Sequence, residues 1–184
     1  MTRIVAGLAG GRRLAVPAGG GTRPTADRVR EALFSSLESE LGGLQGLSVI
    51  DLYAGSGAVG LEALSRGAVR VLLVESDRRA AAVVQANVRA VGLPGASVLT
   101  RPAEKLGPNP AEPYDVLFAD PPYLLGGDEL RAVLAGLAAT GWLTADATVV
   151  VERGAREDWR WPDGFSGSRE RKYGDARLWY GHRD

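Results

Sequence analysis

The chain has 184 residues, of which 45% are hydrophobic and 24% are charged, a composition typical of a soluble globular domain. It contains no cysteine and a single histidine, His182, which excludes thiolate nucleophiles and cysteine-based metal centres and argues against a histidine triad or histidine-rich metal site. No run approaches the roughly 18 apolar residues of a membrane span, and residues 1–14 lack the apolar core of a signal peptide. We therefore expect a cytoplasmic protein with no metal site.

The charge is balanced overall, with 22 basic and 22 acidic side chains, but it is unevenly distributed. Residues 1–31 carry six arginines and two acids, whereas residues 32–150 carry eight basic and thirteen acidic groups. A basic N-terminus on an acidic body indicates a separate surface for a polyanion. The alternative is a solvated arginine-biased segment, since Lys105 and Lys172 are the only lysines in the chain.

The N-terminal part predicts a hairpin followed by a helix. Residues 3–17 alternate loosely around a glycine pair, which predicts a hairpin or two short strands, and three glycines at 19–21 predict a flexible link. From Thr25, whose hydroxyl can cap a helix, apolar side chains recur every four residues, and this spacing predicts an amphipathic helix that ends at Gly42. The apolar positions are Val29, Leu33, Leu37 and Leu41.

From residue 47 onward, continuous apolar runs alternate with helical patterns. The runs predict strands at 47–53, 69–75, 96–100, 114–120 and 147–153, and the helical patterns predict helices at 58–67, 77–92 and 127–141. This alternation is typical of a parallel sheet covered by helices on both faces. Residues 168–183 place Gly174-Asp175 between two polar and aromatic stretches, which predicts an antiparallel hairpin at the sheet edge.

A glycine-rich loop follows the first predicted strand of the sheet. Gly55, Gly57 and Gly60 satisfy G-x-G-x-x-G, and Glu75 ends the second strand 20 residues after Gly55. Glycine lets a ligand approach the backbone, and a carboxylate at the second strand can accept both hydroxyls of a ribose. The pattern alone fits NAD, so an NAD-linked oxidoreductase is an open alternative that NADH binding would reveal.

The acid before this loop indicates a different cofactor. Asp51 would repel a pyrophosphate, but it would attract a cationic aminoacyl group. A ligand with a ribose, a positive amine and no phosphate is S-adenosylmethionine.

The sequence Asp120-Pro121-Pro122-Tyr123 follows the fourth strand, where open sheets of this kind bind ligands. An exocyclic base amine is a poor nucleophile, and acceptors such as the Asp120 carboxylate and the Pro121 carbonyl can hold its N–H bonds in line for methyl transfer. The prolines offer no competing N–H donor, and Tyr123 offers a face for an extruded base. The alternative interpretation is a rigid strand-to-helix turn.

Together these blocks resemble a known family. The acid-and-glycine loop with D-P-P-Y is similar to Rossmann-like methyltransferases that modify base nitrogens. Three stretches resemble the bacterial RsmD family of 16S ribosomal RNA (guanine-N2)-methyltransferases; they are Arg23 to Phe34, Asp51 to Gly57 with Gly60-Leu61-Glu62-Ala63, and Lys172-Tyr173-Gly174-Asp175.

The resemblance implies an α/β fold of the Rossmann-like class I methyltransferase type. The expected sheet is mostly parallel and seven-stranded, with the order 3-2-1-4-5-7-6 and an antiparallel edge hairpin. A small N-terminal β-hairpin extension at 1–22 would contact RNA, and 23–184 would form the methyltransferase domain. The implied partner is 16S ribosomal RNA, within the small subunit or an assembly intermediate, for a monomeric enzyme that has no membrane contact.

The resemblance also implies residue roles. The expected S-adenosylmethionine site comprises Asp51, Tyr53, Ala54, Gly55, Ser56, Gly57, Glu75, Ser76, Asp77, Ala103, Glu104 and Asp120. The expected catalytic residues are Asp120, Pro121, Pro122 and Tyr123. The expected RNA contacts are Arg3, Arg12, Arg13, Arg23, Arg28 and Arg30.

Several alternatives stay open from the sequence. Asp77 can instead cap the following helix, and Glu104 can be a solvated loop acid. D-P-P-Y also serves adenine-N6 methyltransferases, which the small size and the lack of a target-recognition domain disfavour. A non-enzymatic RNA-binding assembly factor would transfer no labelled methyl group.

Overall fold

The computed structural model describes residues 2–18 and 25–184; the glycine link predicted at 19–21 and Arg23 lie outside these ranges. The strands are β1 (Thr2–Arg3), β2 (Arg13–Leu14), β3 (Ser48–Asp51), β4 (Arg70–Glu75), β5 (Ala96–Thr100), β6 (Tyr114–Ala119), β7 (Leu143–Gly154), β8 (Phe165–Tyr173) and β9 (Ala176–Arg183). The helices are α1 (Thr25–Leu41), α2 (Ala58–Ser65), α3 (Arg78–Val91), α4 (Gly127–Ala139) and the short 3-10 helix η1 (Ala103–Lys105).

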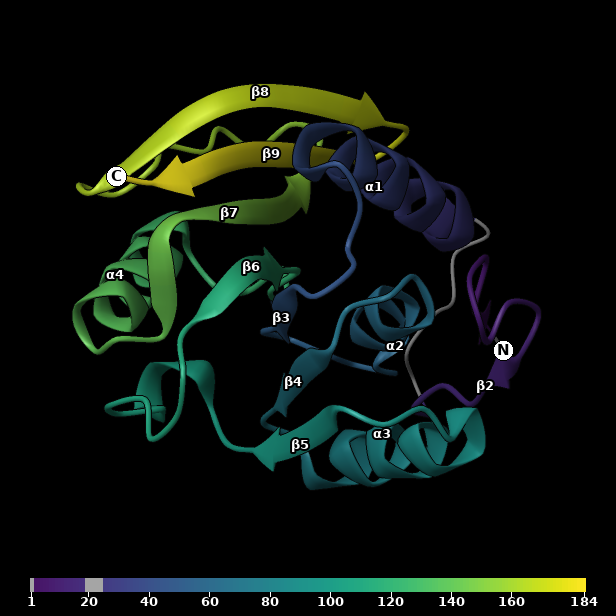
Figure 1. The fold of residues 1–184 in the computed structure, drawn as a ribbon. Helices are drawn as coiled ribbons and strands as arrows, with labels where there is room; N and C mark the ends of the chain where they lie inside the picture. The colour runs from purple at the N-terminus through teal and green to yellow at the C-terminus, as the bar shows by residue number, and fades with distance from the viewer. Residues whose placement is uncertain (1, 19–24) are drawn as a thin grey trace.

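Seven strands form one sheet in the order β5-β4-β3-β6-β7-β9-β8 (Figure 1). The strands from β5 to β7 are parallel to one another, whereas β9 runs antiparallel to both β7 and β8. Numbered along the chain from β3, this order is 3-2-1-4-5-7-6, which confirms the expected topology. The carboxyl ends of β3, β4, β6 and β7 therefore meet at one edge of the sheet, where open α/β sheets bind their ligands.

Helices cover both faces of the sheet, with α1, α2 and α3 on one side and α4 on the other (Figure 1). Alternate residues of the strands separate into two cores, because successive side chains of a strand point to opposite faces. Val49, Leu73 and Phe118 pack in the cluster of α1, α2 and α3, whereas Ile50 and Leu117 pack in the cluster of α4. Burial on both faces explains why these strands appear as continuous apolar runs in the sequence.

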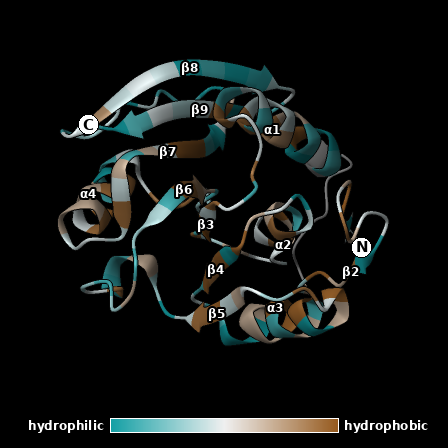
Figure 2. Cartoon of the chain, in the orientation of Figure 1, coloured by the Kyte–Doolittle hydropathy of each residue, from teal (hydrophilic) through white to brown (hydrophobic). Residues whose placement is uncertain are grey.

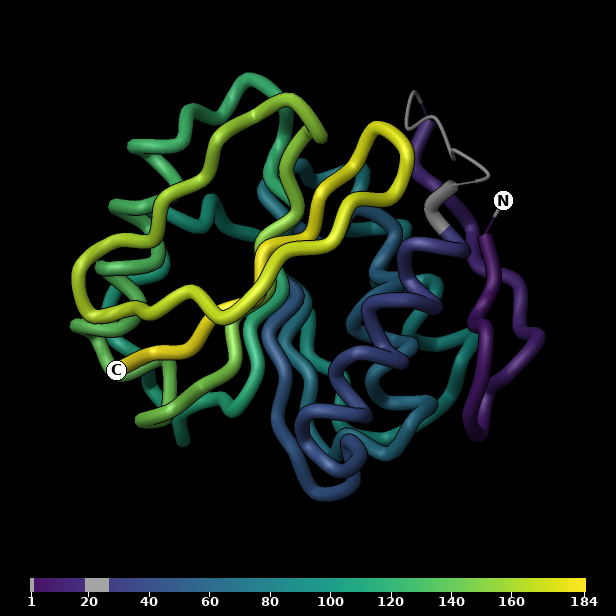
Figure 3. The backbone as a smooth tube through the Cα atoms, turned by 90° about the horizontal axis from the view of Figure 1, so that it is seen from above, coloured from purple at the N-terminus to yellow at the C-terminus, as the bar shows by residue number. Residues whose placement is uncertain are grey.

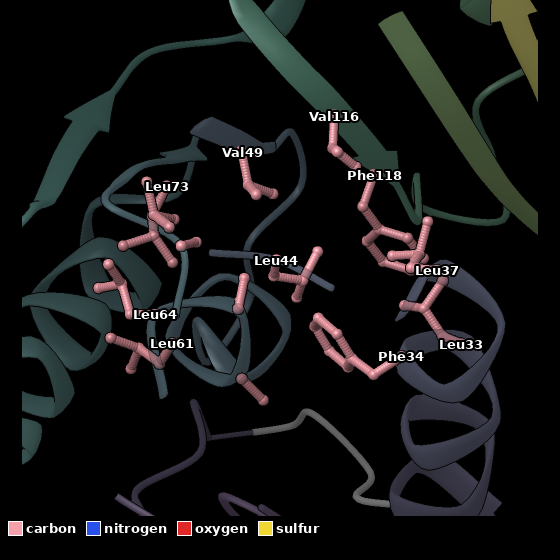
Figure 4. Close-up of a cluster of buried hydrophobic side chains, with 14 of the residues drawn as sticks. Leu33, Phe34, Leu37, Leu44, Val49, Leu61, Leu64, Leu73, Val116 and Phe118 are labelled. Carbon is pink, nitrogen blue, oxygen red and sulfur yellow. The ribbon is translucent and has the colours of Figure 1, made fainter. Parts of the chain in front are cut away.

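Helix α1 brings its apolar stripe onto the sheet. Leu33, Phe34 and Leu37 are each at most 3% exposed, and Figure 4 shows them directed toward Phe118 and Leu44. Full burial of such side chains contributes about 1.5–3 kcal/mol each. The four-residue spacing therefore fixes which side of α1 faces the sheet.

The N-terminal segment forms the expected hairpin, with Thr2 paired to Leu14 and Arg3 to Arg13. It lies beside α1 and the helices of the same face (Figure 3). The amide of Ala9 donates to Ser65 Oγ of α2 at 2.9 Å, and Asn87 of α3 exchanges two hydrogen bonds of 2.9 Å with the backbone of Ala15. The hairpin is thus held against α2 and α3 by buried polar contacts.

The C-terminal strands differ from the expected bounds at their beginnings. β7 begins at Leu143 rather than 147, and its register against β6 shifts between Tyr114 and Val116, where Asp146 adopts a left-handed φ of 60°. Such a bulge interrupts the regular pattern that the sequence prediction relied on. Figure 2 shows the contrast between the apolar colours of β7 and the hydrophilic colours of the edge strand β8. In the described part of the chain, no helix has the length and apolar character to cross a membrane.

Candidate active site

Four acids stand at the carboxyl edge of the sheet. Asp51 ends β3, Glu75 ends β4, Asp120 follows β6, and Glu152 lies near the end of β7. The first three are the acids that the sequence singled out, and the parallel topology brings them to one edge. Glu152 was not anticipated, although its position near the end of the fifth predicted strand is a signal of the same kind.

The glycine loop between β3 and α2 divides its glycines between two tasks. Gly55 has a φ of 57°, and a Cβ placed on it would meet no protein atom within 4 Å, so the space beside it is open. A Cβ on Gly60 would lie 2.8 Å from the side chains of Val71 and Leu73. The first glycine therefore leaves room for a ligand, and the third allows α2 to pack closely on β4.

Asp51 is buried beneath this loop, with 2% of its surface exposed. One carboxylate oxygen accepts a hydrogen bond of 2.9 Å from the amide of Gly60. Burial raises the pKa of Asp51 to about 7; the Gly60 hydrogen bond opposes the rise, and the negative charges of Asp120 and Glu75 add to it. A cation beside this carboxyl would favour its ionised form.

Glu75 accepts hydrogen bonds from the glycine loop and from the start of α3. Its Oε2 accepts a 2.9 Å hydrogen bond from the amide of Gly55, and its Oε1 accepts one of 2.9 Å from the amide of Asp77. These bonds fix the carboxylate, while a carboxylate has about four lone-pair sites in all. Glu75 can therefore still accept hydroxyl groups of a ligand.

The residues expected around an adenine lie further along the same edge. Asp77 is the N-cap of α3, and its side chain accepts a 2.8 Å hydrogen bond from the amide of Ala80. Ser76 is exposed, Ala103 is buried, and Glu104 is exposed on η1. The structure thus gives Asp77 the capping role that the sequence left open as the alternative.

Tyr53 has a buried hydroxyl that finds no hydrogen-bond partner among the described residues. Burial raises the pKa of Tyr53 to about 12, and the nearby charge of Glu104 contributes to the shift. A buried unpaired hydroxyl is costly, and Tyr53 lines the cavity described next. The charges that act on its hydroxyl belong to Glu104, Arg153 and Glu129, which do not line the cavity.

A cavity of about 350 Å³ opens between the glycine loop, α1 and the N-terminal segment, within the size range of small-molecule sites. Of the twelve cofactor residues expected from the sequence, six line it: Asp51, Tyr53, Ala54, Gly55, Ser56 and Asp120. The other expected cofactor residues are not among its lining residues; they are Gly57, Glu75, Ser76, Asp77, Ala103 and Glu104. The wall formed by Val16, Pro17, Val29, Arg30 and Leu33 was missed, because it depends on packing between distant segments.

Asp120 is the one residue of the D-P-P-Y loop that lines this cavity, whereas Pro121 and Tyr123 line a smaller adjoining hollow. Pro121 is buried, whereas Tyr123 is 68% exposed and Leu124 is 98% exposed. Arg153 of β7, which is 8% exposed, donates from Nη1 to the carbonyl of Leu125 at 3.0 Å and forms an ion pair with Glu157. Arg153 therefore ties the loop to β7, a role that the sequence did not indicate.

The expected RNA-contacting arginines differ in exposure. Arg3, Arg12, Arg13 and Arg28 are exposed, and Nη1 of Arg12 donates to the carbonyl of Ala90 at 2.5 Å. Arg23 lies outside the described residues.

Arg30 differs from the four exposed arginines, because it is 5% exposed. It bonds to the carbonyl of Arg3, to Thr2 Oγ1 and to Asp27 at 2.9 Å, and its Nε lies 3.6 Å from Glu62. A guanidinium enclosed by these partners holds the N-terminal segment. Arg30 also lines the cavity, and the expected RNA contact at Arg30 stays a prediction.

Glu62 is the buried acid that organises this region, and it was missed as a functional residue. It is 0% exposed and accepts hydrogen bonds from the amides of Val5 and Ala6, at 2.7 and 2.9 Å. It also pairs with Arg66 at 2.9 Å. The helix that begins at the glycine loop is thereby joined to the N-terminal segment. Among the described residues, no group of three or more metal-ligating side chains is placed to hold a metal ion.

The strand order, the glycine loop and the acid at the end of the second strand define a Rossmann-like class I methyltransferase. Magnesium protoporphyrin IX methyltransferase from Synechocystis PCC 6803, solved with bound S-adenosylmethionine, shares this fold at 18% identity, with a TM-score of 0.67 over 87% of this chain and 80% of that one. The family model described as "Conserved hypothetical protein 95" matches residues 2–182. The chain belongs to this family, which is the RsmD family that the motifs resemble.

Relatives of known name agree with this membership. "Ribosomal RNA small subunit methyltransferase D" of Escherichia coli K12 is 39% identical over 150 residues, covering 82% of this chain and 73% of the relative. The protein of the same name from Haemophilus influenzae is 35% identical, covering 82% and 77%. The solved structure of the Escherichia coli protein yhhF superposes with a TM-score of 0.85 at 32% identity, covering 99% and 97% of the two chains.

Proposed function

We propose that this chain transfers the methyl group of S-adenosylmethionine to the exocyclic N2 amine of a guanine in 16S ribosomal RNA. The observation that carries the proposal is that Asp120, the acceptor for a base amine, lines the same cavity as Asp51 and Gly55, the acceptor and the open loop for a cationic cofactor. The named relatives, small-subunit ribosomal RNA methyltransferases at 35–39% identity, support the choice of substrate.

The residues present fit the cofactor. The open space at Gly55 and the buried carboxyl of Asp51 suit a cationic ligand. Asp51 would hold the ammonium group of the methionine end, and Glu75 would accept the ribose hydroxyls, since both its oxygens are already fixed by backbone amides. When bound, S-adenosylmethionine supplies an electrophilic methyl group on a sulfonium.

Asp120 then has the task of orienting the nucleophile. The lone pair of an exocyclic guanine amine is delocalised into the ring, so the nitrogen must become pyramidal to attack. A carboxylate that accepts one of its N–H bonds favours that geometry and stabilises the positive charge that develops on nitrogen. Tyr123, which is exposed beside the smaller hollow that Asp120 also lines, offers a stacking surface for the extruded base, an interaction of about 1–3 kcal/mol.

The RNA would approach from the side of the N-terminal segment. The exposed side chains of Arg3, Arg12, Arg13 and Arg28 can neutralise phosphates along the N-terminal segment and the start of α1. We infer that residues 1–22 act as the RNA-contacting extension of the methyltransferase domain at 23–184. The enzyme would act as a monomer in the cytoplasm on the small subunit or an assembly intermediate.

The test uses small ribosomal subunits assembled from unmodified RNA. The protein is incubated with these subunits and with S-adenosylmethionine carrying a labelled methyl group, and the RNA is digested to nucleosides. The proposal predicts label in N2-methylguanosine. Label in N6-methyladenosine, or no transfer to subunits or naked RNA by a folded protein that binds the cofactor, would contradict it.

A further inference from the structure

Asp120, the first residue after β6, lies beside Glu152 of β7 at the carboxyl edge of the sheet. The parallel strands β6 and β7 pair Ala119 with Val151, so the next residues, Asp120 and Glu152, are aligned across the two strands. Phe118 and Val150, two residues earlier, belong to the core beneath α1, and side chains two apart on a strand share a face. Both carboxylates therefore project toward the side of the sheet that carries α1 and the cavity.

The cavity lining agrees with this placement. Asp120 and Glu152 both line the 350 Å³ cavity. Both also line a smaller hollow of about 20 Å³ beside Pro121 and Tyr123. Glu152 is thus at the point where a base stacked on Tyr123 would present its edge to Asp120.

A guanine presents two kinds of donor on that edge. Its N2 amine and its N1–H are adjacent, whereas adenine and cytosine each place an unprotonated ring nitrogen beside their exocyclic amine. Enzymes that extrude a base read it by hydrogen bonds to this Watson–Crick edge. An ionised carboxylate can accept hydrogen bonds but cannot donate one. Two neighbouring carboxylates therefore match the two donors of guanine, and they do not match the ring-nitrogen acceptor of adenine or cytosine.

We propose, building on the function proposed above, that Glu152 selects guanine by accepting its N1–H while Asp120 accepts an N–H of the N2 amine. With adenine, a carboxylate would face a ring-nitrogen lone pair, and two acceptors would be left without a donor between them. Sites built around a hydrogen bond reject analogues that lack the donor because their polar groups are left unpaired. Glu152 is therefore a specificity-determining residue, distinct from the amine-orienting Asp120.

The experiment compares guanine with 2-aminopurine, which keeps the N2 amine and has no N1–H. The parent enzyme first locates the methylated guanine in unmodified small subunits, and RNA with 2-aminopurine at that position is then assembled into subunits. Single-turnover rates are measured for the parent and for Glu152→Gln, whose amide can donate to the ring nitrogen of 2-aminopurine. For each substrate, the rate of the variant is divided by the rate of the parent. Comparing these two quotients cancels the different intrinsic reactivities of the two amines.

The preference is the single-turnover rate on guanine divided by the rate on 2-aminopurine. We expect this ratio to be about ten- to a hundred-fold smaller for Glu152→Gln than for the parent. The control is Glu170→Gln, an exposed acid on β8, which should keep the parental preference. A second variant, Glu152→Asp, keeps the negative charge on a side chain that is one methylene shorter, so the carboxylate lies farther from the base. It should slow methylation of guanine about ten-fold and methylation of 2-aminopurine less. Calorimetric binding of S-adenosylmethionine shows that each variant is folded.

An unchanged preference in Glu152→Gln, or a parental guanine rate in Glu152→Asp, would overturn the role of Glu152 and leave the proposed function standing. A parent enzyme that forms no N2-methylguanosine would instead overturn both.

Discussion

Asp51 combines two demands that conflict in the free protein. Its position beneath the glycine loop suits a cationic ligand, but its burial penalises the charge and raises its pKa to about 7. Between about pH 4 and pH 7 the folded state holds a proton that the unfolded chain has released, so the contribution of Asp51 to the free energy of unfolding decreases as the pH rises through that window. The buried carboxyl therefore lowers the free energy of unfolding at neutral pH, while its negative charge favours binding of a cation.

This linkage predicts the pH dependence of cofactor binding. The ionised carboxylate attracts the ammonium group, so affinity for S-adenosylmethionine should rise as the pH is raised from about 6 to about 8, and binding near pH 7 should release a proton. Calorimetry in buffers of different ionisation enthalpy measures both quantities. Asp51→Asn, which can still accept the Gly60 hydrogen bond, should bind more weakly and lose the part of the pH dependence due to Asp51. Equal pH profiles for parent and variant would remove Asp51 from the cofactor site.

Glu75 gives a second residue-scale prediction. Glu75→Ala removes the acceptor for the ribose hydroxyls and should weaken S-adenosylmethionine binding by about 1–3 kcal/mol. Because Glu75 also accepts the amides of Gly55 and Asp77, thermal unfolding must be measured alongside affinity. Unchanged affinity in a folded Glu75→Ala protein would exclude a contact between this carboxylate and the cofactor.

At the scale of elements, α2 joins the cofactor loop to the N-terminal segment. The helix begins directly after Gly57, and its buried Glu62 accepts the amides of Val5 and Ala6 and pairs with Arg66. The N-terminal segment in turn lines the cavity through Val16 and Pro17. The part of the cavity wall formed by Val16 and Pro17 thus depends on the buried hydrogen bonds of Glu62 to the N-terminal segment.

Glu62→Ala should therefore be strongly destabilising. It leaves the amides of Val5 and Ala6 without an acceptor and the Arg66 guanidinium without its buried partner, a loss of about 3–5 kcal/mol for breaking a buried pair. Denaturant unfolding measures the loss, and hydrogen exchange at the two amides shows whether the segment is released.

The matched control for this change is Glu38→Ala. Glu38 also pairs with Arg66, at 3.1 Å, but its side chain is 38% exposed, so its loss should cost at most about 1 kcal/mol. Similar losses for the two variants would show that Glu62 is not the anchor of the segment.

The sequence predicts best those elements whose pattern lies within the element itself. Helices α2, α3 and α4 and the parallel strands follow from apolar periodicity and glycine stops, and their order along the chain implies the sheet. The early start of β7 could not be predicted, because it depends on a bulge at Asp146 and pairing with β6. The short helix η1 lacks enough residues to show a period.

The site was predictable where it follows directly after a strand. The sequence places Asp51, Glu75 and Asp120 at one edge because the carboxyl ends of parallel strands converge; the structure has them there, and their roles stay predictions. The interior position of Arg30 could not be predicted, since an arginine on an amphipathic helix is usually solvated, and its burial depends on Glu62 and the backbone of Arg3. The inner wall formed by α1 depends on the same long-range packing.

At the scale of the whole molecule, the exposed arginines of the hairpin should control RNA affinity without affecting the cofactor. The double variant Arg12→Ala with Arg13→Ala should bind small-subunit RNA more weakly, and the slope of log affinity against log salt should become shallower by about 0.7–0.9 for each phosphate that the protein no longer neutralises. Affinity for S-adenosylmethionine should be unchanged. A parental salt slope would show that these arginines belong to a solvated face.

The most direct test of the methyltransferase mechanism is a single-turnover rate for Asp120→Ala with the enzyme saturated in S-adenosylmethionine and the substrate in small subunits of unmodified RNA. The variant retains the glycine loop, Asp51 and Glu75, so we expect it to bind the cofactor nearly as the parent does. Loss of the group that orients the guanine amine should slow methyl transfer about a hundred- to a thousand-fold. Transfer at the parental rate would contradict the account, because the D-P-P-Y loop would then be a rigid turn with no part in the chemistry.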